Sequence, residues 1–508
     1  MNTLPQKIDP DMKKAIVIGA GFGGLALAIR LQAAGISTTV LEKRDKPGGR
    51  GYVYEQDGFV FDGGPTVITD PDALRELWDL TGHDMDQDVT LMPVSPFYRL
   101  CWEDGYQFDY VNDQDELDRQ IAAKSPEDVE GYRKFLAFSQ DVYHEGYEKL
   151  GTVPFLNFRS MIKAAPQLVR LEAYRSVYSK VASFIKDEQL RQAFSFHSLL
   201  VGGNPFETSS IYALIHALER SGGVWFAKGG TGALVKGMVR HFERLGGSLR
   251  LGAEVDQILT SQGRATGVVV DGETLVADMV ASNGDVVHTY EKLLRDDPRG
   301  AANAAKLRKK RHSMSLFVIY FGLKGLPKNL QHHMVLFGPR YKELIKEIFH
   351  QDGLADDFSL YLHCPTVTDD SLAPPGHSAF YVLSPVPNLG TADIDWEVEG
   401  PRYRDRILDY LDENYIPGLR ENLVTSHILT PFGFRDELNA HLGSAFSIEP
   451  ILTQSAWFRP HNRDDKIPNL YIVGAGTHPG AGVPGVVGSA KATAQLIVDD
   501  AAKGATKE

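Results

Sequence analysis

Three glycines near the start of the chain have the spacing that lets a pyrophosphate approach the backbone. Gly19, Gly21 and Gly24 directly follow the apolar run 15–18, which is typical of a buried strand. The first glycine permits a tight turn, the second leaves room for the phosphates, and the third lets the next helix pack on the strand. That helix points free N–H groups and its positive dipole end at the phosphates. The spacing therefore predicts a dinucleotide site, and the alternative is a structural turn without a ligand.

An acidic residue follows where such a site needs one. Apolar residues between 25 and 31 predict a helix ending near Gly35, and residues 37–41 predict a second strand that ends at Glu42. A carboxylate at this strand end accepts hydrogen bonds from both hydroxyls of a ribose and disfavours a 2′-phosphate. Strand, glycine turn, helix and acidic strand end together make a complete nucleotide-binding unit.

A second glycine pair, with an arginine, comes soon after Glu42. Residues 47–50 are Pro-Gly-Gly-Arg, and residues 59–65 are an apolar strand followed by Asp-Gly-Gly-Pro. A simple NAD domain has no need of these segments. Here the sequence resembles the flavoprotein amine-oxidase superfamily, in which a glutamate, five residues and Gly-Gly-Arg lie against FAD. The alternatives are a surface ion pair for Arg50 and an ordinary turn at 63–64.

The end of the chain repeats the pattern of strand, glycine loop and helix. Residues 469–473 predict a buried strand, residues 474–488 are rich in glycine and proline, and residues 489–502 predict a helix. A helix N-terminus near Gly485 favours a ring that gains negative charge on reduction, such as an isoalloxazine. We therefore expect both ends of the chain to clasp one flavin; the alternative is a glycine-rich loop without a ligand.

A middle segment is expected to complete the sheet around the adenosine half of the cofactor. Residues 229–244 predict a glycine turn and a helix, residues 248–256 predict strands, and residues 268–280 predict a hairpin. The fold class we expect is α/β, with a Rossmann-like FAD-binding domain, an inserted mixed-sheet substrate domain and a helical cap. The expected parts are an FAD-binding domain of residues 1–75, 225–295 and 465–508, a helical, membrane-facing cap of residues 76–224, and a substrate-binding domain of residues 296–464.

Several segments together resemble a narrower group, the carotenoid desaturases of the bacterial phytoene desaturase type. The resemblance extends over nearly all of residues 13–500, apart from about a dozen extra N-terminal residues. It implies that FAD is the redox cofactor and that phytoene is dehydrogenated stepwise, through partially desaturated intermediates, commonly to lycopene. It rests on residues 19–30, 44–50, 61–66, 202–205, 229–231 and 477–488. The cofactor contacts that we expect are Gly19, Gly21, Phe22, Gly24, Glu42, Lys43, Gly48, Gly49, Arg50, Gly64, Val255, Gly474, Gly476, Gly485 and Val486.

Desaturation removes a hydride and a proton from neighbouring carbons, so the protein has to position the hydrocarbon and exclude water while the cofactor accepts the hydride. No motif identifies the catalytic proton acceptor; Thr477 and His478 could lie near the flavin, although His478 is equally well a structural hydrogen-bonding residue.

We expect no metal site, and we expect the pair His332 and His333 to lie in a surface loop. The final electron acceptor is either a quinone or oxygen.

Composition narrows the possible partners and the compartment. The 508 residues include 53 Lys and Arg against 66 Asp and Glu, and the net charge of -13 disfavours nucleic acid as a partner. The two cysteines, Cys101 and Cys364, exclude a disulfide framework and favour a reducing compartment. The first twelve residues lack the apolar core of a signal peptide, and no run of about 18 apolar residues predicts a membrane span.

Residues 158–186 carry basic residues at Arg159, Lys163, Arg170, Arg175, Lys180 and Lys186 against the one acid Glu172, and apolar positions 171, 174, 178, 181 and 185 fall on one helical face. This pattern predicts a basic amphipathic helix, Arg159–Lys186, that contacts a membrane surface. We therefore expect peripheral attachment to the cytoplasmic side of the bacterial cell membrane; the alternative is a helix packed on the core. Five aromatic residues could line the substrate tunnel, and the alternative for each is ordinary packing in the core: Phe194, Phe196, Tyr320, Phe380 and Tyr381.

Other functions remain open at this point. One is another carotenoid-modifying enzyme, such as a ketolase, an isomerase or a saturase. A second is an amine oxidase, which would need a cage for a cationic nitrogen and commonly links its flavin to a cysteine. A third is a prenyl-chain binding protein of the same fold, such as a GDP dissociation inhibitor, against which the intact glycines, Glu42 and Arg50 argue.

Overall fold

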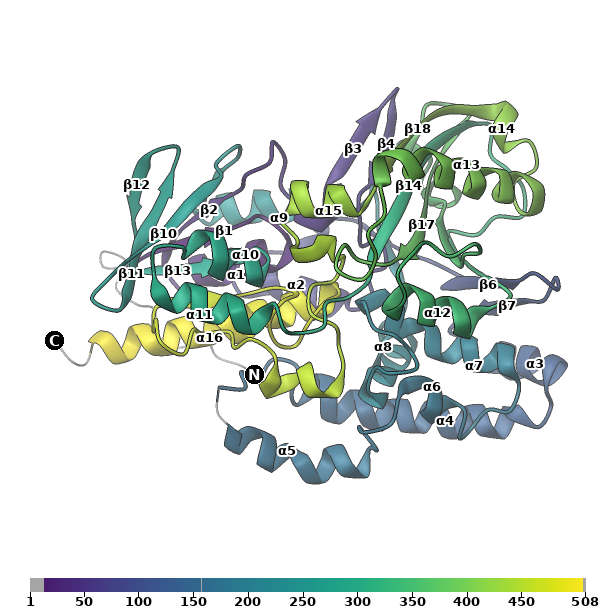
Figure 1. The fold of residues 1–508 in the computed structure, drawn as a ribbon, viewed down its shortest axis with the longest axis horizontal. Coiled ribbons are helices and arrows are strands. Elements are labelled where there is room, and N and C mark those ends of the chain that lie inside the picture. Colours follow the sequence, from purple (N-terminus) through teal and green to yellow (C-terminus); the bar gives the residue numbers. More distant parts are fainter. Residues whose placement is uncertain (1–12, 157, 506–508) are drawn as a thin grey trace.

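The computed structural model describes residues 13–156 and 158–505 (Figure 1). A five-stranded sheet, with strand order β19-β13-β1-β2-β9, is parallel throughout. It joins strands from the beginning, the middle and the end of the chain, and the predicted α/β class is confirmed. The strands are β1 (Lys14–Ile18), β2 (Ser37–Leu41), β9 (Ser248–Arg250), β13 (Met279–Ser282) and β19 (Leu470–Ile472).

The helix that follows β1 is buried on nearly every side. α1 (Phe22–Ala33) packs against α9 (Thr231–Arg244) and against α16 (Val483–Ala505), which lies beside the sheet in Figure 1. Its sequence is apolar on nearly every side, as a helix enclosed by other elements requires. Its one charged side chain, Arg30, is paired with Glu76 at 3.1 Å.

The expected hairpin over 268–280 is wrong in one respect. A small antiparallel sheet contains β10 (Val255–Ser261), β11 (Arg264–Val270) and β12 (Glu273–Val276), but the chain then leaves it and enters the parallel sheet as β13. Val276 is 73% exposed, whereas every residue of β13 is buried. Asp278 divides the apolar run at this crossing.

A mixed seven-stranded sheet forms the second large layer, with strand order β18-β14-β17-β16-β15-β6-β7. Only the pair β15 and β6 is parallel among the pairs of this sheet, all of which lie in the described residues. Segment 76–224 thus supplies two strands to it besides its helices. The strands are β6 (Tyr98–Trp102), β7 (Gln107–Tyr110), β14 (Ser315–Lys324), β15 (His333–Phe337), β16 (Leu360–His363), β17 (His377–Val386) and β18 (Leu423–Leu429).

Helices cover both faces of this sheet. Figure 1 shows the blue and teal helices of segment 76–224 gathered on one side of the green strands, with α13 (Trp396–Asn414) on the other. An aromatic core that includes Tyr98, Phe194 and Phe196 fills the first interface, and Trp396 packs on Phe317 in the second. The first group contains α3 (Gln114–Lys124), α4 (Asp128–Val142), α5 (Phe158–Arg170), α6 (Val177–Val181), α7 (Glu188–Ser195) and α8 (Leu214–Gly222). The earlier helix α2 (Pro71–Asp79) instead packs on α1 and α16 beside the parallel sheet.

Shorter elements connect these layers. Among the described residues, no helix has both the length and the apolar character required to cross a bilayer. The remaining helices are α10 (Val286–His288), α11 (Pro298–Leu307), α12 (Tyr341–His350), α14 (Leu419–Asn422) and α15 (Pro431–Leu438), and two further strand pairs join β3 (Val53–Gln56) to β4 (Phe59–Asp62) and β5 (Leu91–Pro93) to β8 (Trp225–Ala227).

The single amphipathic helix predicted for Arg159–Lys186 is wrong. α5 ends at Arg170, and the chain turns at Glu172, whose φ is +53°, before the short α6. The Glu172 carboxylate holds this turn because it accepts hydrogen bonds from Arg175 and Lys180, each at 2.9 Å. The predicted apolar face is therefore divided, since Val181 is fully buried and Tyr174 is 69% exposed.

The side chain of Asn469 joins the parallel sheet to the small antiparallel sheet. Its Oδ1 accepts the N–H of Ala265 at 2.9 Å, and its Nδ2 donates to the carbonyls of Ala265 and Asp278, both at 2.7 Å. We predict that Asn469→Ala lowers the free energy of unfolding by about 2–4 kcal/mol, because it leaves buried backbone groups without partners. Urea denaturation followed by circular dichroism measures the change.

The control is Asn414→Ala, which removes an exposed amide that donates only to the carbonyl of Tyr410 in its own helix. That variant should unfold at the wild-type urea concentration. Equal midpoints for the two variants would show that the bridge from Asn469 does not stabilise the fold.

Candidate functional site

A cavity of about 570 Å³ extends from the glycine turn after β1 to the interior between the seven-stranded sheet and the helices of segment 76–224. One end is formed largely by glycine-rich backbone and charged side chains, and the other by apolar side chains. The apolar end includes Leu171, Leu199, Leu200, Ile211, Ile215, Leu316, Val318, Val335 and Phe337.

The turn after β1 has the geometry that its sequence predicts. Gly19 has φ of +93°, and its N–H donates to the carbonyl of Leu41 at 2.7 Å. A Cβ on Gly24 would lie 2.0 Å from the carbonyl oxygen of Gly19, so only glycine lets α1 pack this closely on β1. Gly21 precedes the first residue of α1, and the N-terminus of that helix opens into the cavity.

Glu42 is buried at the carboxyl end of β2. Its Oε2 accepts the N–H of Ala20 at 2.8 Å, and its Oε1 accepts the N–H of Arg44 at 3.0 Å. Both oxygens keep further lone pairs for a ligand, while the turn fixes their direction. Lys43 also lines the cavity, and its ammonium group donates to the carbonyl of Asp436 at 2.9 Å and to Asn439 Oδ1 at 3.0 Å.

The Gly-Gly-Arg segment faces the first glycine turn. Gly48 and Gly49 have φ of +128° and +57°, and a Cβ on Gly49 would lie 3.3 Å from the Cα of Gly21. Arg50 lines the cavity and donates from Nε to the carbonyl of Ala445 at 2.6 Å. Burial lowers the pKa of this guanidinium, and the carboxylate of Asp285 opposes that shift. Gly64 lies against Arg50, because a Cβ there would be 2.0 Å from its carbonyl oxygen.

The chain end supplies the facing wall. Residues 478–486 line the cavity, and α16 starts at Val483, six residues before the start of the helix predicted at 489–502. Pro484 does not prevent this earlier start, because a proline in the first helical turn costs no hydrogen bond. Gly485 lies in that first turn, where a Cβ would be 2.7 Å from the carbonyl oxygen of Gly480. His478 donates from Nε2 to the carbonyl of Leu150 at 2.9 Å, and burial lowers its pKa to about 4.

Twelve of the fifteen predicted cofactor contacts line this cavity, including Phe22, Val255 and Val486. The other three, Gly24, Gly474 and Gly476, lie behind its wall and let elements pack closely. A Cβ on Gly476 would be 2.4 Å from a methyl group of Val286, and one on Gly474 would be 2.6 Å from Asn283 Oδ1.

Two residues of the site were missed from the sequence. The Asn283 side chain lies among Gly21, Gly23 and Gly474, within 3 Å of where a Cβ on each would be. Asp285 caps α10 and accepts the N–H of Val287 at 2.9 Å, while its Oδ2 has no hydrogen-bond partner in the part of the chain that the structure describes. Their position after a strand of the parallel sheet was the available signal, because ligands bind where such strands end.

The aromatic residues predicted to line a tunnel divide into two sets. Phe196 and Tyr381 line the cavity, but Phe194, Tyr320 and Phe380 lie in the hydrophobic cores around the sheet. A period-two pattern shows that alternate residues of a strand share a face, but it does not show which face meets the cavity.

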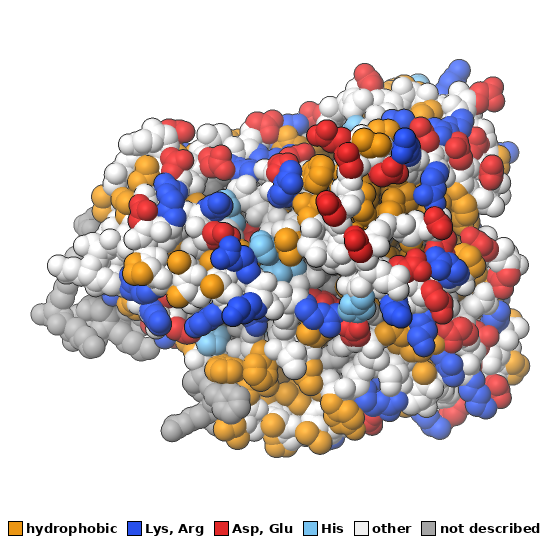
Figure 2. Space-filling view, in the orientation of Figure 1, with side chains coloured by type: hydrophobic (Ala, Val, Ile, Leu, Met, Phe, Trp, Pro, Cys, Tyr) orange, Lys and Arg blue, Asp and Glu red, His pale blue; other side chains and the backbone are white. Residues whose placement is uncertain are grey.

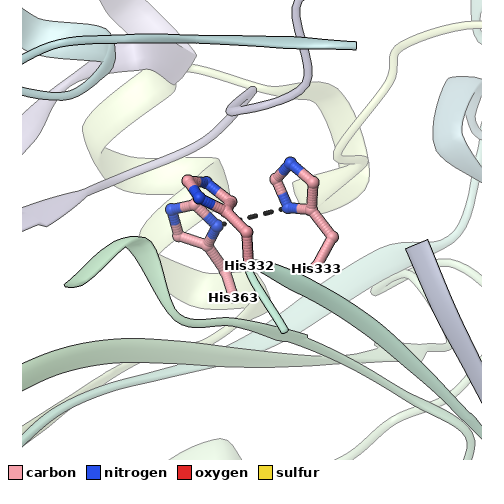
Figure 3. A group of neighbouring side chains, drawn as sticks. All are labelled: His332, His333 and His363. Atoms are coloured by element: carbon pink, nitrogen blue, oxygen red, sulfur yellow. Dashed lines mark hydrogen bonds between the residues drawn. The ribbon is translucent and has the colours of Figure 1, made fainter. Parts of the chain in front are cut away.

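The prediction that His332 and His333 lie in a surface loop is wrong. His333 begins β15 and pairs across the sheet with His363, and His332 directly precedes it. The three side chains, 3%, 0% and 1% exposed, form a compact group whose candidate ligand atoms lie within 4.8 Å of one another (Figure 3). Burial lowers the pKa of all three imidazoles, to about 3 for His332.

Known proteins resemble this chain over almost its whole length. The family described as flavin containing amine oxidoreductase matches residues 22–498. A phytoene desaturase (lycopene-forming) from Paracoccus sp. (strain N81106 / MBIC 01143) is 68% identical over 494 residues, which are 97% of this chain and 99% of the relative. One from Pantoea ananas is 64% identical over 490 residues, 96% of this chain and 100% of the relative.

Solved structures share the fold at low sequence identity. An oxidoreductase from Methanosarcina mazei has a TM-score of 0.63 at 19% identity, covering 95% of this chain and 100% of its own. Wild-type putrescine oxidase bound to putrescine has a TM-score of 0.62 at 17% identity, covering 96% and 99%. The chain belongs to the flavin containing amine oxidoreductase family and, within it, to the bacterial phytoene desaturases that its sequence resembles.

Proposed function

We propose that this protein is an FAD-dependent oxidoreductase of carotenoid biosynthesis that desaturates phytoene stepwise to lycopene. The single observation that carries the proposal is the composition of the cavity, which has a dinucleotide corner at one end and an apolar channel at the other. The two relatives at 64–68% identity bear the name phytoene desaturase (lycopene-forming), and they match this chain almost end to end.

The polar end of the cavity fits FAD. Gly21 and Gly49 leave space that side chains would fill, and Glu42 presents lone pairs where the ribose hydroxyls of the adenosine half would lie. The N-terminus of α16 supplies N–H groups and a positive dipole end for the ring. The unpartnered Oδ2 of Asp285 is a further acceptor for the cofactor.

Each of the predicted residues has one of two roles in this proposal. Those on the cavity wall contact FAD, and Gly24, Gly474 and Gly476 hold the elements behind the wall close together. The same proposal divides the chain into an FAD-binding part of residues 1–75, 225–295 and 465–508, a cap of residues 76–224 and a substrate-binding part of residues 296–464.

The apolar end of the cavity positions the hydrocarbon. Side chains such as Leu200, Ile215 and Phe337 offer no hydrogen bonds, so they hold an extended polyene by burial alone and exclude water from the reacting carbons. FAD, when bound, accepts the hydride. Because these apolar side chains offer no polar anchor, the chain can slide past them between successive desaturations.

Contact with a membrane would deliver a substrate that dissolves only in lipid. The inner face of α5 lines the cavity through Met161, Ala164 and Leu168. Its outer face exposes Ile162 and Val169 (60% and 66%), and Figure 2 shows hydrophobic side chains gathered along the lower edge of the molecule, where α5 lies. Tyr174 and Phe458 are exposed nearby.

We propose that this apolar patch rests on the cytoplasmic surface of the bacterial membrane and that α5 separates the lipid from the cavity. Charge contributes less than the sequence predicts at the basic residues whose side chains the structure describes, which leaves out Arg159 and Lys163. Arg175 and Lys180 pair with Glu172, and Lys186 pairs with Glu127 at 2.9 Å. Burial of apolar side chains in the membrane interface therefore supplies the main attraction.

Protein loaded with FAD and incubated with phytoene in liposomes should produce lycopene, which chromatography with absorbance detection identifies. Parallel incubations in air and with a quinone under nitrogen distinguish the two candidate electron acceptors. Neurosporene as the end product would limit the number of steps, since relatives at 46–47% identity are named neurosporene-forming. Unreacted phytoene in both incubations would contradict the proposed reaction.

Glu42→Ala should weaken FAD binding about 10- to 100-fold, because hydrogen bonds to a charged group contribute roughly 1.5–3 kcal/mol. Glu42→Gln should lie between this variant and the wild type. Quenching of flavin fluorescence measures the dissociation constant, and far-ultraviolet circular dichroism reports the fold. Glu55→Ala, an exposed glutamate on β3, is the control and should bind FAD normally. An unchanged dissociation constant for Glu42→Ala would refute this role.

The double variant Ile162→Asp/Val169→Asp should co-sediment with liposomes far less than the wild type, because it places two charges in the apolar patch. Val276→Asp, which adds a charge to an exposed valine of β12 in the small sheet, should sediment like the wild type. Equal losses for both proteins would show that a general charge effect, and not the α5 patch, governs binding.

A further inference from the structure

A small polar group interrupts the apolar wall of the cavity. The hydroxyls of Thr66 and Tyr381 are hydrogen-bonded at 2.7 Å, and the hydroxyl of Tyr361 lies 3.3 Å from the same Thr66 oxygen. All three residues line the cavity, and all are at least 92% buried. Hydroxyls in such a place need hydrogen-bond partners, since burying one without a partner costs free energy.

This group lies at the cofactor end of the channel. Thr66 follows Gly64 by two residues, and Gly64 is packed against the backbone of Arg50. The carbonyl of Pro65, between them, accepts a hydrogen bond from Thr231 at 3.0 Å, which holds the segment against the N-terminus of α9. A hydrocarbon in the channel therefore meets these hydroxyls close to where the flavin would be bound.

The buried imidazoles stand directly behind the hydroxyls. Tyr361 lies 2.6 Å from His333 Nδ1, and His363 Nδ1 lies 3.4 Å from that same nitrogen. His332 Nδ1 lies 2.6 Å from the hydroxyl oxygen of Thr368, a half-buried residue at the edge of the group. Hydrogen bonds thus connect the cavity wall to His333, whose Nδ1 has a single lone pair and accepts from Tyr361 and not from the more distant His363.

The protonation states suit a group that receives protons. Burial raises the pKa of Tyr361, so its hydroxyl keeps its proton, and burial lowers the pKa of His333, so its ring is neutral. A hydrogen bond from Tyr361 to Nδ1 leaves the ring proton of His333 on Nε2, which has no partner among the described residues. The lone pair on Nδ1 is then directed at the tyrosine.

The geometry is less suited to a metal ion. Figure 3 shows His333 turning one ring nitrogen toward His363 and the other away from the group. The inward nitrogen already has Tyr361 at 2.6 Å, so a metal bound there would displace that hydrogen bond. Metal ligands in proteins use one ring nitrogen for the ion and the other for the supporting hydrogen bond.

We propose that Tyr361, supported by His333, accepts the proton that leaves the substrate in each desaturation. This inference rests on the proposed function. As the hydride leaves one carbon for FAD, the C–H bond of the neighbouring carbon breaks and its electron pair forms the new double bond. The proton passes to the Tyr361 oxygen while the tyrosine proton passes to His333 Nδ1. No oxidant beyond FAD is needed, because the residues move only a proton.

The weak basicity of a buried imidazole is no obstacle to this transfer. Loss of a hydride leaves a carbon centre with cationic character, and the neighbouring C–H is then a far stronger acid than an imidazolium ion. Tyr361 touches the substrate, whereas His333 acts through Tyr361 as a positioning residue. Tyr361 without its imidazole, or the imidazole without Tyr361, would therefore be equally ineffective.

Tyr361→Phe and His333→Gln test the proposal in FAD-loaded protein with phytoene in liposomes. Each should lower kcat by about 100-fold or more, the usual contribution of a positioned proton acceptor, and leave KM within about twofold. The double variant should be no slower than the worse single variant, because the two residues act as one unit. The wild type should react more slowly in D2O, and Tyr361→Phe should lose that difference.

The controls are Tyr403→Phe and His312→Gln, which remove a buried hydroxyl and a buried imidazole outside the cavity wall. Both should keep the wild-type kcat. FAD affinity and thermal unfolding of every variant report folding. If His333→Gln does not fold, Tyr361→Phe and its loss of the D2O effect still decide the question.

Three results would overturn the proposal. The first is a kcat within threefold of the wild type in Tyr361→Phe. The second is a double variant whose fold-loss in kcat equals the product of the fold-losses in the two single variants. The third is stoichiometric metal in the purified protein that is absent from His333→Gln, which would make the histidines a metal site. A wild type that leaves phytoene unreacted would instead refute the proposed function, so the two failures are distinguishable.

Discussion

The position of β13 between β1 and β19 is the constraint on which the site depends. The three strands run parallel, so their carboxyl ends lie at one edge of the sheet, and the segments that follow them meet there. The meeting is tight, because a Cβ on Gly23 would lie 3.2 Å from the Cα of Gly474 and 2.7 Å from Asn283 Oδ1. Two glycine loops from opposite ends of the chain thus become the two walls of one cavity.

The cavity combines two kinds of environment that are usually separate. The walls of its first part are backbone and charged side chains, which suit phosphates and ribose. The walls of its second part are mainly apolar side chains. Three polar side chains in the second part, Thr66, Tyr361 and Tyr381, bond to one another, and Tyr361 also bonds to the imidazole of His333. A site can therefore be apolar enough for a polyene and still contain a group that takes up a proton.

Local patterns were sufficient for much of the fold and the cofactor corner. The run into Gly19, the spacing to Gly24 and the acid at Glu42 each report on a few neighbouring residues, and the structure forms the predicted strand, turn and helix there. The single helix predicted over 158–186 was wrong, because periodicity assumes one continuous helix. The chain instead turns at Glu172, where ion pairs with Arg175 and Lys180 hold the turn. The hairpin predicted over 268–280 was wrong for a similar reason, because its second apolar run supplies β12 to one sheet and β13 to another.

The sequence by itself determined the α/β class, the family and the glycine turns, because these depend on backbone conformations that few residue types allow. Only the tertiary structure decided that His332 and His333 are buried, that Asn283 lies between the chain ends, and which aromatic residues line the cavity. Those facts depend on pairing between segments far apart in the chain. His333 is buried because β15 lies between β6 and β16, and nothing in the residues next to it specifies those neighbours.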